Sequence, residues 1–450
     1  MGASLDYFYQ YPFASAVGEW ERGFGLRLAT CGVNQEHPYF FHGKLRNPRC
    51  IGDMLLVLSD IVTRHFFLRS PVLRDPVVTS SETMLRFEGF SGCCGVYARA
   101  DFLPEAFQSD LQARGTTNVD FNNPMRAALT RLRSQENVQL SVGREEVAIS
   151  RSGDTVVEKK VKLPIRWIKG FSEVQAYLPI LAPMFEIDAH EARQFIRSLP
   201  RGSAPKQPTY VAQAQRSLRL SFRPSAGAIR LQGLDRIRVL EPLLGSAKGL
   251  RVWADNESGV SGWEVQFDVG RFFLLVSPES YRGFSGEGQI LEKLAANNCP
   301  EAINLVAAEL GWQNIVESDA ISRKTGLGID EVRRALAVLG SRGLAGYDVS
   351  AGAYFHRELP FELDKVEELQ PRLQGARELL EENKVRLVAT IAADQFDLLV
   401  EGTEVEHTVR LRPDQDKCTC PWFSKHQGQR GPCKHILAAQ MFVEKGEYSE

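Results

Sequence analysis

Four side chains near the carboxyl end of the chain have the types and spacing of a metal site. One residue separates Cys418 from Cys420, and Cys433 and His435 repeat that spacing after twelve intervening residues. Zinc in structural sites prefers four tetrahedral nitrogen and sulfur ligands. The pattern therefore predicts one structural Zn²⁺, and we expect this segment to need the metal in order to fold.

The spacing also predicts how the ligands are held. Side chains two residues apart on a strand point to the same side, so Cys418 and Cys420 can reach one ion from an extended strand end. Residues two apart on a helix diverge by about 200°, so Cys433 should precede a helix and His435 should lie in its first turn. Apolar residues at 436–442 can form that helix. We expect a ββα zinc knuckle.

Other interpretations of these residues exist. The three cysteines could be unrelated thiols, and His407 and His426 are rival ligands. His407 belongs to an alternating strand pattern, where it could instead pack beside a ligand, and His426 is expected to be solvated on the loop. Four protein ligands leave no open position for water, so the site is predicted to be structural and not catalytic.

The C-x-C, variable loop and C-x-H arrangement resembles the SWIM zinc finger, and the small apolar run after the histidine is also present. SWIM fingers are associated with DNA binding and with protein contacts, in bacterial helicase-like ATPases, transposases and signalling proteins. The resemblance is confined to the C-terminal end of the chain and does not choose between those two roles.

Three further phrases are distinctive: FSGCCGVYARADFLPEAF, GTTNVDFNNPMRAAL and YFHRELPF. With them the whole chain resembles bacterial SWIM-domain proteins found alongside a MoxR-type AAA+ ATPase and a von Willebrand factor A protein. This second resemblance implies an accessory subunit of such an ATPase system. The three phrases match no catalytic template.

Composition places the chain among globular proteins. Hydrophobic residues make up 43% and charged residues 24% of its 450 residues, a length that suits about three domains of ~150 residues. No apolar stretch reaches the ~18 residues of a membrane span, so we expect no membrane contact and a cytoplasmic location. The eight cysteines lack the spacing of a secreted disulfide scaffold, which predicts a reduced compartment.

The predicted fold class is α+β and multidomain, with a mixed N-terminal domain, an antiparallel β-rich middle, a winged helix-turn-helix and a C-terminal ββα zinc knuckle. The predicted boundaries are 1–205 for the N-terminal domain of unknown role, 206–285 for the β-rich basic domain, 286–361 for the winged-helix-like domain and 362–450 for a strand-rich segment with the zinc finger.

The β-rich middle is predicted from alternation and turn residues. Leu218, Leu220 and Phe222 alternate with polar residues, so they should share one apolar face. Further strands are expected at 228–231, 250–254, 263–269 and 272–276, with a turn at 256–259. Residues 201–251 contain ten Lys or Arg against two Asp or Glu, a local charge of +8. This surface could be a nucleic-acid platform, but a solvated sheet face is the commoner explanation.

A winged helix is predicted from two helices and a hairpin. Ser318 is expected to cap a helix ending at Gly326, and apolar residues recur at helical spacing through 330–340. Two short strands, 344–349 and 353–357, should follow. Asp330 and Glu331 offset the arginines of the second helix, so a protein-docking or structural role is favoured over DNA contact.

No enzyme motif is complete. Cys93 and Cys94 would need a base such as His65, and residues 115–120 lack the P-loop ending. We predict a non-enzymatic zinc-binding adaptor or scaffold that docks protein partners, with an AAA+ ATPase or von Willebrand factor A protein as candidate partners. The alternative is a DNA-binding regulator. Residues predicted to contact nucleic acid or a partner are Arg219, Arg223, Arg323, Lys324, Arg333, Arg334, Lys425 and Arg430.

Overall fold

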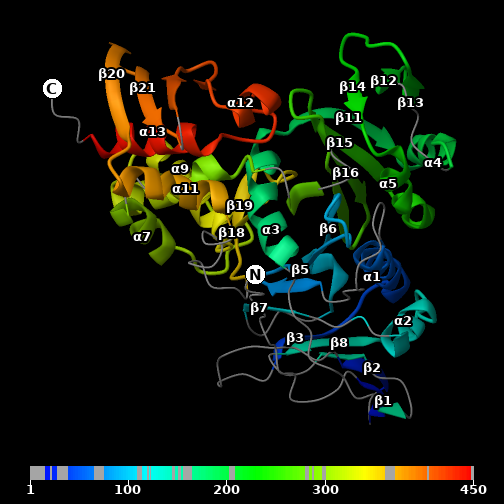
Figure 1. Cartoon of the computed structure of the whole chain (residues 1–450). Helices are drawn as coiled ribbons and strands as arrows, with labels where there is room; N and C mark the ends of the chain where they lie inside the picture. The colour runs from blue at the N-terminus through cyan, green and yellow to red at the C-terminus, as the bar shows by residue number, and fades with distance from the viewer. Residues whose placement is uncertain are drawn as a thin grey trace.

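The structure is a computed structural model that mixes helices with antiparallel sheets (Figure 1). It describes residues 16–20, 23–27, 39–64, 76–108, 114–118, 121, 123–143, 147–149, 154–155, 165–201, 208–278, 283–285, 288–295, 300–359, 370–402 and 405–446. This confirms the α+β class and the antiparallel sheets. Among the described residues, no helix is both long and apolar enough to cross a lipid bilayer.

An eight-stranded antiparallel sheet forms the centre of the fold, and strands from both sides of the predicted boundary at residue 205 join in it. Its middle pair is β6 with β17, which are far apart in sequence. In order across the sheet, the strands are β11 (Ala182–Asp188), β15 (Gly249–Asp255), β16 (Val260–Gln266), β17 (Gly270–Val276), β6 (Val96–Phe102), β5 (Leu85–Phe90), β4 (Val77–Ser80) and β7 (Gly115–Asn118).

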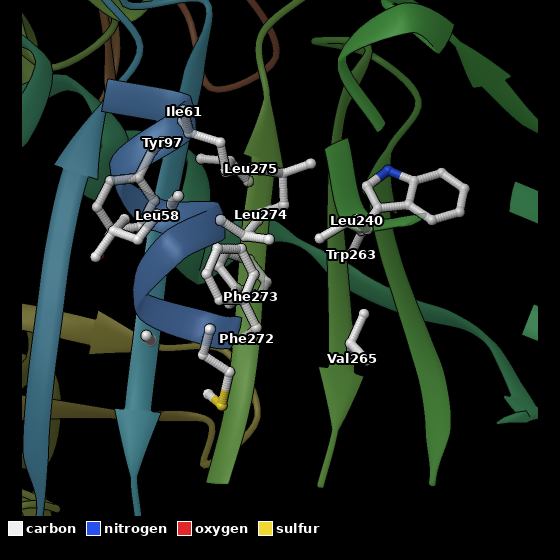
Figure 2. Close-up of a cluster of buried hydrophobic side chains, with 14 of the residues drawn as sticks. Leu58, Ile61, Tyr97, Leu240, Trp263, Val265, Phe272, Phe273, Leu274 and Leu275 are labelled. Carbon is white, nitrogen blue, oxygen red and sulfur yellow. The ribbon is translucent and has the colours of Figure 1, made fainter. Parts of the chain in front are cut away.

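The two faces of this sheet differ in polarity because side chains alternate along each strand. On β6, alternate residues such as Ala98 and Ala100 belong to an apolar face that packs on helix α1 (Pro48–Thr63). Figure 2 shows Leu58 and Ile61 of α1 among the buried side chains at this face. The opposite face carries charged residues, and it is covered by helix α3 (Ile165–Tyr177) and a hairpin from the C-terminal half of the chain.

Smaller sheets surround the centre. A six-stranded sheet contains β10 (Asp154–Thr155), β1 (Ala16–Trp20), β2 (Gly23–Arg27), β9 (Val147–Ile149), β8 (Gln139–Gly143) and β3 (Tyr39–Lys44), and a three-stranded sheet contains β13 (Ser217–Ser221), β12 (Thr209–Ala214) and β14 (Ile229–Leu231). The α-helices described before residue 286, besides α1 and α3, are α2 (Asn123–Thr130), α4 (Ala189–Ser198) and α5 (Leu234–Ile237). The described residues also form four 3₁₀ helices.

The C-terminal half begins with a helical cluster and ends with the cysteine-rich segment. Its elements are α6 (Leu291–Ala295), α7 (Pro300–Ala308), α8 (Ser318–Thr325), α9 (Ile329–Ser341), the hairpin β18 (Ala345–Asp348) and β19 (Ala353–His356), α11 (Pro371–Glu381), the four-stranded sheet β20 (Val385–Ala392), β21 (Gln395–Glu401), β22 (Glu406–Leu411) and β23 (Lys417–Cys418), then α12 (Pro421–His426) and α13 (Lys434–Lys445).

Several local predictions need correction. Ser318 is the first residue of α8 and not its cap, because Glu317 precedes the helix and makes no side-chain capping bond. Phe222 lies outside β13 and is 62% exposed, so it does not join the apolar face predicted from the alternation. The strand predicted at 263–269 starts earlier and ends at Gln266, because Phe267 donates its backbone N–H to the carbonyl of Gly270 in the turn.

Candidate metal centre

The four predicted ligands meet at one point of the C-terminal segment. Their ligand atoms all lie within 4.8 Å of one another, and each side chain is no more than 6% exposed. Bond lengths of about 2.3 Å for Zn–S and about 2.0 Å for Zn–N place tetrahedral ligand atoms about 3.5 to 3.8 Å apart. The 3.9 Å between Cys418 Sγ and His435 Nδ1 is close to that spacing. The donor set therefore fits one structural Zn²⁺.

Two helix starts hold the second and third cysteines. Cys420 precedes α12 and its sulfur accepts the backbone N–H of Phe423 at 3.3 Å. Cys433 precedes α13 and accepts the N–H of Ile436 at 3.4 Å. A helix N-terminus carries partial positive charge and favours the thiolate that zinc requires. The expected position of Cys433 before a helix and of His435 in its first turn is confirmed.

The electrostatics of the three sulfurs call for a cation. Hydrogen bonds from the Cys418 and Cys433 thiols lower the pKa of Cys420, and the same contact with Cys420 raises the pKa of Cys418. Three adjacent thiols share protons in this way because three neighbouring negative charges repel. A divalent ion supplies the missing countercharge and allows all three to bind as thiolates.

The rival histidines lie beside the cluster and not in it. The ring of His407, on β22, is 4.5 Å from that of His435, centroid to centroid. This agrees with the alternative that His407 packs against a ligand. His426 ends α12, where its ring is 4.8 Å from that of Trp422. The predicted loop after Cys420 thus begins with a short helix that the sequence analysis did not anticipate.

The loop before ligand Cys433 is held by Arg372 of α11, which the sequence analysis did not single out. Its guanidinium Nη1 donates to the carbonyls of Arg430 and Pro432, both at 2.7 Å, next to ligand Cys433. The same guanidinium lies 4.6 Å from the ring centroid of Trp422. No local pattern marks this arginine, because its partners are about sixty residues away in the chain.

A second polar cluster lies between the eight-stranded sheet and the β18–β19 hairpin, and we call it the buried charge cluster. Seven of its eight side chains are at most 1% exposed and Arg271 is 15% exposed. Its four cationic and four anionic members are Arg86, Arg99, Arg271, Arg357, Glu88, Asp101, Glu264 and Asp348. Equal numbers of opposite charges let the cluster stay buried without a counterion.

Asp348 links the hairpin to the sheet in this cluster. Its carboxylate accepts from Arg86 at 2.9 Å and from Arg99 at 3.1 Å, and it also pairs with Arg271. Burial opposes ionisation of this carboxyl, but the three guanidinium groups outweigh it and lower its pKa. Arg357, just after the hairpin, pairs with Glu88 of β5. The FSGCCGVYARADF and YFHRELPF phrases, which no catalytic template explains, contribute Arg99, Asp101 and Arg357 to this contact.

The remaining predicted site residues are scattered. Arg219 and Arg223 are exposed at the three-stranded sheet, and Arg323, Lys324, Arg333 and Arg334 are exposed on α8 and α9. Lys324 pairs with Glu309, and Arg333 lies 3.7 Å from Asp330. Lys425 and Arg430 lie beside the zinc ligands. The structure therefore does not join the eight predicted contacts into one surface.

The cysteine pair considered for catalysis is enclosed. Cys93 is 1% exposed and Cys94 is fully buried, and burial raises the pKa of Cys94 to about 12. A thiol with so high a pKa is a poor nucleophile near neutral pH. His65, the base named for that hypothesis, lies outside the residues that the structure describes.

Comparison with known families finds a match of residues 407–439 to the SWIM zinc finger. This confirms the resemblance seen in the C-x-C and C-x-H steps. A search of curated proteins gives no match.

Among solved structures, one similar chain is Proliferating Cellular Nuclear Antigen from Entamoeba histolytica, with 8% identity, 54% of this chain and 99% of that chain covered, and a TM-score of 0.35. Another comes from the C-terminal region of FEN-1 bound to A. fulgidus PCNA, with 11% identity, 53% and 98% coverage, and a TM-score of 0.37. Because both TM-scores are low, neither match establishes a common fold.

Proposed function

We propose that the chain is a non-enzymatic zinc-binding adaptor or scaffold that docks protein partners. The zinc site carries this proposal. Three cysteines and one histidine fill a tetrahedral coordination sphere, and a closed sphere holds structure without activating water. Two helices and the last strand of the four-stranded sheet supply the four ligands. The metal thus serves to hold a surface in shape.

Charge distribution favours a protein partner over nucleic acid. Binding to duplex DNA gains most of its affinity from a contiguous set of Lys and Arg that neutralise phosphates. The predicted basic residues instead lie on three separate parts of the molecule, and two of them have acidic partners within ion-pair distance.

The elements from α8 to β19 follow the order of a winged helix, and we propose that this unit is a structural and docking piece. Asp348 and Phe355 of the hairpin are each 1% exposed and pack against the sheet, while Ala351 and Gly352 at its tip are exposed. The body of the hairpin is therefore used for packing within its own chain, which supports a structural role for this unit.

The candidate partners are a MoxR-type AAA+ ATPase and a von Willebrand factor A protein. Affinity purification from native cells tests this, with the wild-type chain and a Cys433→Ser, His435→Ala variant as baits. We expect the wild type to retain one of these partners and the variant to lose it, because the variant cannot close its zinc site.

A charge-reversed control separates the two functions. Arg323→Glu with Arg334→Glu on α8 and α9 should leave the protein partner bound. The opposite outcome is that the wild type binds DNA, that salt weakens this binding steeply, and that the charge-reversed variant loses it. That outcome would instead establish the DNA-binding regulator.

A further inference from the structure

A cleft of about 1020 Å³ lies between the zinc finger and the three- and eight-stranded sheets. The end of α12 and the loop after it form one wall, β14 and the β15–β16 turn form the opposite wall, and the end of α3 with residues 177–180 forms the floor. Figure 1 shows α3 in the middle of the molecule, between α12 and the strands β14 and β15. Neither wall belongs to the zinc site itself.

The wall on the zinc side is basic. Lys425, His426 and Arg430 line it, and Lys293 adds a fourth nitrogen base from α6. The opposite wall contributes Arg230. Because Asp255 and Glu257 lie on that same opposite wall, the excess positive charge of the cleft is on its zinc side.

The acidic residues of the cleft are partly engaged. Asp255 accepts the backbone N–H of Ser258 at 2.8 Å, and Glu292 accepts from Gln440, outside the cleft, at 3.3 Å. Glu257 is exposed on the β15–β16 turn. Across the whole cleft, four Lys or Arg side chains therefore face three carboxylates, and three of the four cations lie on the zinc side.

Hydrogen bonds from two neighbouring segments hold the loop of the basic wall. Arg372 fixes the carbonyls of Arg430 and Pro432, and the side-chain amide of Gln289 donates to the carbonyls of Gly428 at 3.3 Å and Gln429 at 3.2 Å. Because this loop leads into ligand Cys433, the zinc site and the wall share one backbone.

Gln289 is itself anchored from the floor of the cleft. The buried Glu173 of α3 accepts the backbone N–H groups of Gly288 at 2.9 Å and Gln289 at 2.7 Å. Gly288 has φ +97°, and a Cβ there would lie 2.0 Å from Nη2 of Arg372. Only glycine allows these two anchors to approach so closely. Hydrogen bonds therefore position the zinc side of the cleft relative to α3.

We propose that this cleft binds an extended acidic peptide segment of the docked partner, an inference that rests on the proposed function. The basic wall suits carboxylates. Side-chain amides of Gln232 and Gln429 can pair with a peptide backbone, and Ile180, 54% exposed, offers an apolar contact. Tyr177 is the one aromatic ring of Phe, Tyr or Trp type among the described lining residues, and it is 3% exposed, so the cleft has no free platform for stacked bases.

Fluorescence anisotropy with a short labelled peptide of Glu residues around a central Leu tests the proposal. The zinc-loaded full chain should bind it, and should bind a version with Gln in place of every Glu about tenfold or more weakly. Lys425→Glu with Arg430→Glu should weaken the acidic peptide by about tenfold or more. The matched control, Arg219→Glu with Arg223→Glu on the distant three-stranded sheet, should keep the wild-type affinity.

Each variant is first shown to contain wild-type zinc, which excludes misfolding of the finger. Unchanged binding by the Lys425 and Arg430 variant, or equal loss in the control, would overturn the proposal. So would a single-stranded oligo-dT that binds more tightly than the peptide and shows the same dependence on these residues.

The experiments distinguish failure of the cleft proposal from failure of the adaptor proposal. If the native partner still binds the Lys425→Glu, Arg430→Glu variant, docking stands and the cleft is not its site. If the wild type binds the acidic peptide but no protein partner, the cleft stands and the adaptor function does not.

Discussion

The zinc finger and the buried charge cluster both place polar groups in a dry interior, but they assemble them differently. The four zinc ligands lie between residues 418 and 435, whereas the eight charges are spread from residue 86 to residue 357. The first site needs an external cation to neutralise its thiolates, whereas the second neutralises itself with four arginines and four carboxylates.

Polar groups are accommodated inside this protein in two ways. A local cluster can be completed by a metal because its ligands are adjacent before the chain folds. A dispersed cluster forms only after β5, β6, β16 and β17 have paired and the β18–β19 hairpin has docked. Loss of one member should therefore have a local effect in the first case and an effect on domain docking in the second.

Removal of a zinc ligand should have the largest effect. Structural zinc contributes about 10–16 kcal/mol of binding free energy in zinc-finger peptides. In Cys433→Ser, or after chelation, we expect the amides of β20 to β22 and α13 to lose hydrogen-exchange protection while the eight-stranded sheet keeps it. Cys50→Ser, remote from the finger, is the control. Full protection of α13 without zinc would show that the metal is not structural.

Loss of Asp348 should have the next largest effect. Asp348→Asn leaves Arg86, Arg99 and Arg271 with one fewer negative partner in a buried setting, which costs about 3–5 kcal/mol for comparable pairs. Urea unfolding should show this loss, while the zinc content stays at the wild-type level. A change below about 1 kcal/mol, the range of exposed pairs, would mean that the cluster does not hold the hairpin.

Glu173 should give the fold a distinct pH dependence. Burial raises the pKa of its carboxyl from 4.5 to about 7 in the folded state. Its contribution to stability is therefore fully present below the unfolded pKa of 4.5 and is lost as pH rises through about 7. The difference in unfolding free energy between wild type and Glu173→Gln should change across that window. A constant difference would show that Glu173 titrates normally.

The exposed pair of α9 should have the smallest effect. Asp330 and Arg333 lie 3.7 Å apart with side chains 76% and 65% exposed, and such pairs contribute about 0–1 kcal/mol. Asp330→Asn should therefore leave urea unfolding almost unchanged. A loss of unfolding free energy as large as that of Asp348→Asn would show that buried and exposed charges contribute equally to stability.

The zinc ligands, the helix after Cys433, the strands of the four-stranded sheet and the helix pair with its hairpin could all be predicted from the sequence. Each depends on residues a few positions apart, such as the C-x-H step, and local geometry restricts them strongly. The partner proteins and the winged-helix assignment remain predictions, since they depend on resemblance or on function.

Only the tertiary structure decided where the charges of FSGCCGVYARADF and YFHRELPF go, why Glu173 lies beside Gly288, and that Arg372 fastens the zinc loop. Alternation on β6 shows that Arg99 and Asp101 share a face, but it cannot show that a hairpin two hundred and fifty residues later supplies Asp348. The sequence by itself determined the chemistry of the metal site because its ligands are neighbours. The partners of the buried charges are set by the tertiary fold, because the local sequence around a charged residue does not indicate which distant residue will neutralise it.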